Sequence, residues 1–155
     1  MKEVRKIVVP VDFSQHTAKI AEYAIYVAKC FAANVSFVHV AEGYGGRYAG
    51  IAHPSFEDVE NELRQQAEKK MEHLVTDTSS ESVKCTGKVL VGDVEEGIIE
   101  YATDEKADLL VIGTHGVKGL EKILLGSVAE RVVKKAPCPV LTFNPYQEGR
   151  VSQPG

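Results

Sequence analysis

The residues Lys6 to Val11, KIVVPV, form a nearly continuous run of β-branched and apolar residues close to the start of the chain. Such a run predicts a strand that is buried on both faces, as in a parallel sheet. Comparable apolar runs occur at residues 35–40 (VSFVHV), 109–113 (LLVIG) and 140–143 (VLTF), and residues 83–91 alternate enough to form another strand. We therefore expect five strands along the chain.

Helical spacing of apolar residues fills the segments between these runs. Ser14 is expected to cap a first helix that runs to about Ala33, with Asn34 available for its exit. Asp93, followed by Glu96, has the pattern of a capping box at the start of the third helix. The second and fourth helices are expected to begin at residues 55 and 127.

Strict alternation of strands and helices indicates the α/β class and a single domain over residues 1–146. Right-handed crossovers then produce an open five-stranded parallel sheet with helices on both faces. Prolines beside the last strand, Pro139 and Pro145, place this strand at an edge of the sheet, where it favours pairing with a second copy. The polar residues 147–155 are expected to form a disordered tail.

The bulk composition excludes several classes of function. The chain has 155 residues, of which 44% are apolar and 26% are charged, as in an ordinary globular domain. A net charge of −4 offers no basic surface to nucleic acid. The N-terminus lacks the apolar core of a signal peptide, so we expect a cytoplasmic protein with no membrane partner.

The fourth strand leads into residues 113–127, GTHGVKGLEKILLGS, which match neither the Rossmann fingerprint nor the Walker A loop. Gly113 and Gly116 would let the backbone turn with positive φ and lie directly against a ribose or a phosphate. Gly126 and Ser127 open a helix whose first N–H groups form a ready anion site. An ordinary turn followed by an ordinary N-cap accounts for the same spacing equally well.

Ligands of open parallel sheets gather at the carboxyl ends of the strands. Residues 10–12, Val40 and the glycine-rich segment all follow the ends of predicted strands. Asp12 there is either a ligand of ribose hydroxyls or of a metal ion, or a residue that caps a loop. No histidine, cysteine or carboxylate spacing indicates a metal site formed by the protein alone.

Residues 1 to about 144 resemble the universal stress protein family, with VPVDFS, VHV, GTHG and LLGSVAERVV similar to its landmarks. The pattern G-x2-G-x9-G-S resembles the mark of the ATP-binding branch of that family. The resemblance implies a Rossmann-like sheet in the order 3-2-1-4-5, of the adenine nucleotide alpha hydrolase type. It also implies a homodimer joined through the fifth strands.

The same resemblance implies ATP or AMP bound across the strand ends, with magnesium or manganese held through the phosphates. Residues implied for the adenine and ribose are Pro10, Val11, Asp12 and, through its backbone, Val40. Residues implied for the ribose and phosphates are Ile112, Gly113, His115, Gly116, Gly126, Ser127 and Val128. Ala129 stands where some ATP-binding members have a threonine hydroxyl.

These features favour a nucleotide-binding regulatory or sensor module of the stress response. The alternative is a slow ATP hydrolase or phosphotransferase, for which Asp12, His115 and Lys118 are available but no spacing commits them. A phosphoacceptor domain of the response-regulator type requires an acidic pair after the first strand and a lysine after the fifth. The chain has Asp12 alone and Phe143-Asn144-Pro145 at these places.

Overall fold

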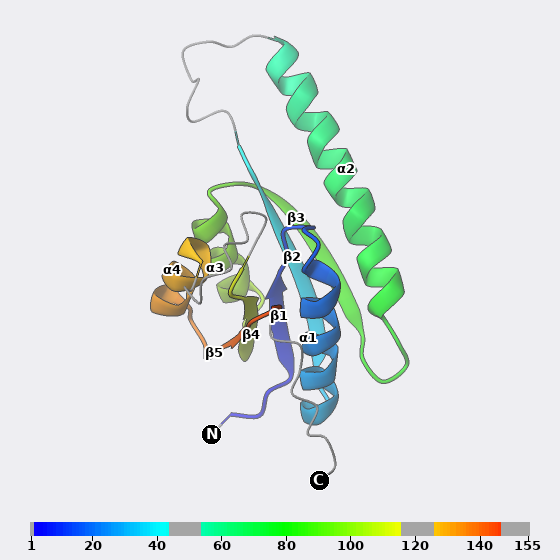
Figure 1. The fold of residues 1–155 in the computed structure, drawn as a ribbon, viewed down its shortest axis with the longest axis vertical. Helices are drawn as coiled ribbons and strands as arrows, with labels where there is room; N and C mark the ends of the chain where they lie inside the picture. Colours follow the sequence, from blue (N-terminus) through cyan, green and yellow to red (C-terminus); the bar gives the residue numbers. More distant parts are fainter. Residues whose placement is uncertain (1, 44–53, 116–125, 147–155) are drawn as a thin grey trace.

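The computed structural model describes residues 2–43, 54–115 and 126–146. The elements along the chain are β1 (Lys6–Pro10), α1 (Thr17–Phe31), β2 (Asn34–Glu42), α2 (Pro54–Thr78), β3 (Cys85–Gly92), α3 (Val94–Asp104), β4 (Leu109–Gly113), α4 (Ser127–Lys135) and β5 (Val140–Phe143). The five strands form one parallel sheet in the order β3-β2-β1-β4-β5 (Figure 1), which confirms the predicted fold and strand order. The expected tail at 147–155 lies outside the described residues.

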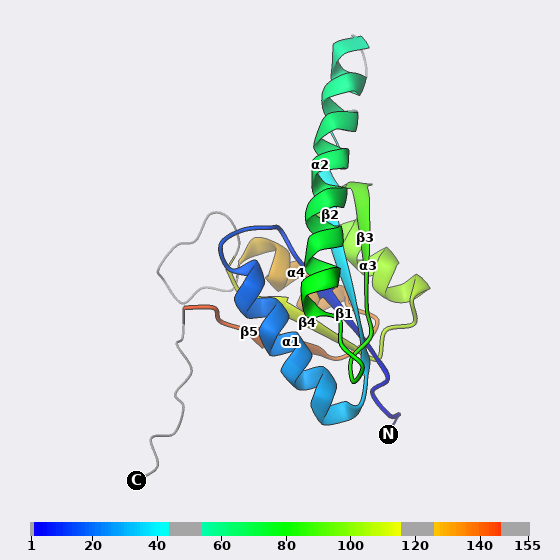
Figure 2. The same cartoon turned by 90° about the vertical axis from the view of Figure 1, so that its right-hand side faces the viewer.

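Helices cover both faces of the sheet, α1 and α2 on one face and α3 and α4 on the other (Figure 2). Along β1, Ile7 and Val9 pack into the core beneath α1 and α2, whereas Val8 packs into the core beneath α3 and α4. All three side chains are fully buried. The uninterrupted apolar run of β1 follows from this arrangement, because successive side chains of a strand point to opposite faces and both faces exclude water.

Asp108 links the starts of two neighbouring strands, β1 and β4. Its Oδ2 accepts hydrogen bonds from the backbone N–H groups of Arg5 and Lys6, each at 3.1 Å. The backbone N–H of Asp108 donates to the Lys6 carbonyl at 2.9 Å. The hydrogen bond from Arg5 is the main cause that holds the pKa of this carboxyl below its ordinary value.

The first helix differs from its prediction at both ends. It begins at Thr17, because Ser14 forms a turn of its own: the Ser14 hydroxyl accepts from the His16 N–H at 3.2 Å, and the Ser14 carbonyl accepts from the Thr17 N–H at 3.1 Å. The helix ends at Phe31, and the next residue, Ala32, adopts the left-handed conformation with φ of 53°. Asn34 is already the first residue of β2. Ser14 as N-cap and Asn34 as helix exit were therefore wrong.

The apolar face predicted for α2 is buried along only part of the helix. Ala67 and Met71 are buried against the sheet, whereas Val59 and Leu63 are 49% and 45% exposed. Figures 1 and 2 show the reason, since the N-terminal part of α2 extends beyond the sheet. Within the described residues, no helix is both long enough and apolar enough to cross a membrane.

Candidate functional site

The turn that follows β1 is held in a strained conformation. Asp12 Oδ1 accepts a hydrogen bond from the Ser14 N–H at 2.9 Å, as in an Asx turn. Phe13 lies between them with φ of 55°, in the left-handed region that residues with a Cβ rarely adopt. Such backbone strain persists only where the surroundings impose it, and it concentrates at functional sites.

His39 of β2 stabilises this turn from the neighbouring strand. Its ring Nδ1 lies 2.8 Å from the Val11 carbonyl, and because a carbonyl only accepts, Nδ1 is the nitrogen that carries the hydrogen. The His39 ring also packs against the Phe13 ring, with 4.6 Å between centroids. His39 was not among the residues predicted for the site. The available signal was a histidine inside the apolar run of residues 35–40, where Ser36 is the other polar residue.

Val40 lies in the part of β2 that extends beyond the end of β1. The last register pair of β1 and β2 is Pro10 with Val38, and the Val11 N–H donates to the Val38 carbonyl at 2.9 Å. Alternate residues of a parallel strand direct their backbone groups to the same side. The N–H and C=O of Val40 therefore point to the side on which β1 has already ended.

Three apolar residues of the predicted site have buried side chains. The side chains of Val11, Val40 and Ile112 are all buried in the two cores of the domain. Val40 packs so closely on α3 that a Cβ on Gly97 would lie 2.9 Å from its Cγ2. A ligand at the strand ends would thus meet main-chain groups from these three residues.

The two ends of the glycine-rich segment converge, as the prediction requires. The Thr114 N–H donates to the Phe143 carbonyl of β5 at 2.9 Å, which extends the pairing of β4 with β5 by one residue. The Thr114 carbonyl accepts from the Gly126 N–H, also at 2.9 Å. Thr114, which directly follows β4, is therefore hydrogen-bonded to the residue that precedes α4. Gly116 and Lys118, which were also considered for this site, lie outside the described residues.

Gly113 has little room for a side chain, for a reason that the sequence did not predict. It does not adopt a positive φ, and a Cβ on it would lie 2.5 Å from Cδ1 and 3.2 Å from Cγ1 of Ile20 in α1. Gly126 also has an ordinary φ, −56°, and a Cβ on it would lie 3.0 Å from the Thr114 carbonyl oxygen. The positive φ expected at Gly113 was wrong. Both glycines instead permit close packing that holds the strand end and α4 in place.

The N-terminus of α4 presents backbone N–H groups of the kind that bind anions. The first hydrogen bond inside the helix runs from the Glu130 N–H to the Gly126 carbonyl at 2.9 Å, so the N–H groups of Ser127, Val128 and Ala129 precede the helical ladder. These groups lie at the positive end of the helix dipole. The Ser127 side chain is exposed, whereas the Ala129 methyl is buried in the core.

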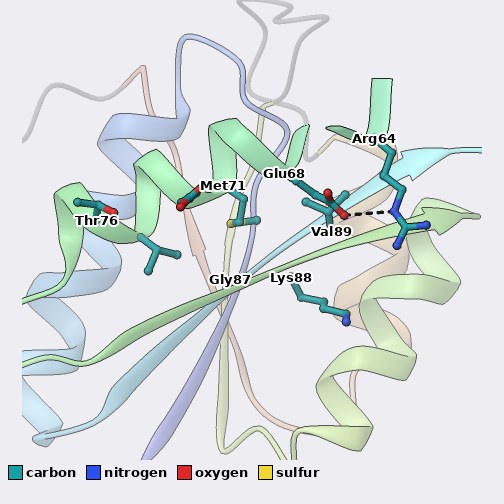
Figure 3. Close-up of a pocket in the computed structure, with 9 residues that line it drawn as sticks. Arg64, Glu68, Met71, Thr76, Gly87, Lys88 and Val89 are labelled. Carbon is teal, nitrogen blue, oxygen red and sulfur yellow. Dashed lines mark hydrogen bonds and ion pairs between the residues drawn. The ribbon is translucent and has the colours of Figure 1, made fainter. Parts of the chain in front are cut away.

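The described residues also contain a cavity of about 370 Å³ between α2 and β3 (Figure 3). Met71 lies over Gly87, where a Cβ would come within 2.6 Å of the Met71 sulfur. Arg64 and Glu68 form an ion pair with each other at 3.2 Å on the helix beside it. The cavity shares no residue with the strand-end site and contains neither a strand terminus nor a helix N-terminus, so we attribute it to the packing of α2 on the edge strand.

A doubly wound parallel sheet whose strand ends meet an open helix N-terminus defines a Rossmann-like protein with the geometry of an anion site. The chain belongs to the universal stress protein family, whose family model matches residues 3–144. Two universal stress proteins of Methanocaldococcus jannaschii are similar to it. One is 39% identical over 138 residues, which cover 88% of this chain and 80% of the relative. The other is 35% identical over 151 residues, which cover 88% and 93%.

Solved structures of the family show the same fold. The structure of the second Methanocaldococcus jannaschii protein superimposes with a TM-score of 0.79 at 29% identity and covers 92% of this chain and 97% of its own. A universal stress protein from Archaeoglobus fulgidus, solved in complex with dAMP, has a TM-score of 0.64 at 26% identity and covers 91% and 98%. That relative is therefore a member of the same family that holds an adenine nucleotide.

Proposed function

We propose that this protein binds an adenine nucleotide, ATP or AMP, across the carboxyl ends of β1 and β4 and the N-terminus of α4. The observation that carries the proposal is the hydrogen bond from the Gly126 N–H to the Thr114 carbonyl. It joins the end of β4 to the helix start that offers the N–H groups of residues 127–129. The complex of the Archaeoglobus fulgidus relative with dAMP supports the choice of an adenine nucleotide.

Each part of the nucleotide then meets a different part of the site. The N–H groups of Ser127, Val128 and Ala129 bind phosphate oxygens at the positive end of α4. Asp12, positioned by its hydrogen bond to the Ser14 N–H, lies beside the ribose. The backbone of Val40 is directed to the open side of β2 and reads the edge of the adenine.

The remaining predicted residues complete this arrangement through main-chain contacts. Pro10 ends β1 and Val11 follows it next to the adenine, and Ile112 and Gly113 end β4 next to the ribose. His115, two residues after β4, is proposed to lie near the ribose and phosphates. Gly116 belongs to the same proposed set and lies outside the described residues.

Magnesium or manganese would reach this site through the phosphates of the nucleotide. Among the described residues, no group of three or more histidine, cysteine or carboxylate side chains has the geometry to hold a metal ion. A divalent ion supplies charge neutralisation to a bound polyphosphate, and the protein contributes backbone N–H groups beside it.

We propose further that the protein acts as a regulatory or sensor module of the stress response in the cytoplasm, as a homodimer joined through β5. β5 is the edge strand beside β4, and its residues Val140, Leu141 and Phe143 are only partly buried within one chain. An apolar edge strand readily pairs with the same strand of a second copy. Sedimentation of the protein with and without ATP measures whether the nucleotide changes the association state.

A single substitution tests the proposed phosphate contacts. Ser127→Pro removes the N–H of the first residue of α4, a position where proline is compatible with the helix. The preceding Gly126 has φ of −56° and ψ of 152°, which is the extended conformation that a residue before proline adopts. We expect calorimetry to show at least about tenfold weaker ATP binding, or about 1.4 kcal/mol.

The matched control is Ser127→Ala, which keeps the N–H and removes the hydroxyl. We expect it to bind ATP within about threefold of the wild type, because the proposed contact is made by the backbone. Both variants should unfold at similar urea concentrations. Equal ATP affinity of Ser127→Pro and the wild type would remove the helix N-terminus from the site, and an absence of ATP or AMP binding by the wild type would refute the proposed function.

A further inference from the structure

One tyrosine beyond β5 joins two histidines from distant parts of the chain. The Tyr146 hydroxyl lies 3.1 Å from Nε2 of His16, which precedes α1 and is buried. The Tyr146 ring also meets the His115 ring nearly perpendicularly, at 85°, with 4.8 Å between centroids. Edge-to-face contacts of this kind stabilise a defined relative orientation of two rings. Tyr146 thus connects His16, which precedes α1, with His115, which follows β4.

The contact of Tyr146 with His115 continues to the start of α4. Nδ1 of His115 lies 2.7 Å from the Thr114 hydroxyl. The backbone of Thr114 in turn donates to the Phe143 carbonyl and accepts from the Gly126 N–H. Thr114 is therefore held by β5 through its backbone and by the His115 ring through its hydroxyl.

The backbone of Tyr146 is itself anchored, although its side chain is 41% exposed. Its N–H donates to Asn144 Oδ1 at 3.0 Å, in a turn that directly follows β5. The preceding Pro145 is fully buried, and its carbonyl accepts from Lys19 Nζ of α1 at 3.4 Å. The Tyr146 ring also packs edge-on against the His16 ring, with 4.7 Å between centroids. A side chain anchored at its backbone and packed between two histidine rings can hold a neighbour in place.

We propose that Tyr146 is a positioning residue for the nucleotide site. It holds His115 and Thr114 so that the hydrogen bond from Thr114 to Gly126 is formed before the nucleotide arrives. Pre-organisation of this kind strengthens binding because less conformational entropy is lost when the ligand binds. The inference about affinity rests on the proposed function. The effect on the hydrogen bond between Thr114 and Gly126 does not, because it is measured in the nucleotide-free protein.

The experiment measures amide hydrogen exchange by NMR in the nucleotide-free protein. We expect Tyr146→Ala to accelerate exchange of the Gly126 and Thr114 amides at least about tenfold, because local opening of this segment becomes easier. The Val11 amide, which donates to Val38 at the end of β1, is the internal reference and should be unchanged.

Two further variants separate positioning from a general loss of stability. Tyr146→Phe keeps the ring beside His115 and loses only the hydroxyl contact with His16, so exchange at Gly126 should stay within about threefold of the wild type. Tyr26→Ala removes a tyrosine of α1 that is 64% exposed and should leave the Gly126 amide unaffected. In calorimetry, ATP affinity should fall at least about fivefold for Tyr146→Ala alone.

The outcomes discriminate between the two proposals. Unchanged exchange of the Gly126 amide in Tyr146→Ala overturns the positioning role, as does an equal acceleration at Val11, which would indicate global destabilisation. Faster exchange at Gly126 with unchanged ATP affinity also overturns the proposed effect on binding. If exchange responds as expected but the wild type binds neither ATP nor AMP, the support given to Thr114 and Gly126 stands and the proposed function fails.

Discussion

The packing of Gly113 against Ile20 makes a quantitative prediction about stability. A Cβ on Gly113 would lie 2.5 Å from Cδ1 of Ile20, a residue of α1 whose side chain is buried in the core. Overpacking of a core by one methyl group costs about 1–3 kcal/mol. We therefore expect Gly113→Ala to lower the free energy of unfolding by that amount, measured by urea denaturation with linear extrapolation.

A second substitution shows whether the Cδ1 contact is the cause. Ile20→Val removes Cδ1 and by itself costs about 0.5–1.5 kcal/mol. In the double variant the closest contact is gone and the 3.2 Å approach of Cγ1 remains, so the rescue is partial. We expect the double variant to be more stable than the sum of the two single effects predicts, by about 1–2 kcal/mol.

The control pair combines Gly113→Ala with Ile98→Val, which lies in the core on the opposite face of the sheet. Its effects should add, because the two residues share no contact surface. Additive effects in the Ile20 pair, with a large cost for Gly113→Ala alone, would show that the backbone conformation of Gly113, and not its packing on Ile20, requires glycine. A negligible cost for Gly113→Ala would refute the packing argument altogether.

Three further outcomes follow from contacts of the fold. Asp108→Ala should lose about 1–2 kcal/mol of stability near neutral pH, since two backbone N–H groups lose their acceptor. The folded pKa of Asp108 lies below its ordinary 3.8, so the part of this contribution that depends on the ionised carboxylate is complete above that pH and is lost as the pH falls through the lowered value. The gap between variant and wild type should therefore shrink at low pH, and a gap of undiminished size contradicts the assignment. Gly97→Ala should lower the melting temperature despite the better helix propensity of alanine, because its Cβ would lie 2.9 Å from Val40 Cγ2; a raised melting temperature argues against this contact. NMR of the ring nitrogens should find the hydrogen of neutral His39 on Nδ1, and its location on Nε2 would exclude the bond to Val11.

The candidate site was partly predictable because its location follows from general rules. Strand ends of a parallel sheet meet at one edge, and a helix start preceded by Gly126 offers free N–H groups wherever it lies. The contact of His39 with the Val11 carbonyl and that of Tyr146 with His115 follow no such rule. Each joins residues far apart in the sequence, and no local pattern encodes which side chains meet.

Patterns among neighbouring residues in the sequence were sufficient to predict which segments form strands and helices. The apolar runs predicted the strands because a strand covered on both faces excludes polar side chains, and Asp93 was predicted as a helix cap that the structure confirms through its bond from the Glu96 N–H. The start of α1 was wrong because Ser14 uses its hydroxyl within a preceding turn. Only the tertiary structure showed why Gly113 is glycine, since the obstacle to a side chain there is Ile20, a residue of another element. Hydrophobic periodicity and capping act between residues a few positions apart and can be read along the chain, whereas steric exclusion and side-chain contacts across the sheet exist only after distant segments have packed together.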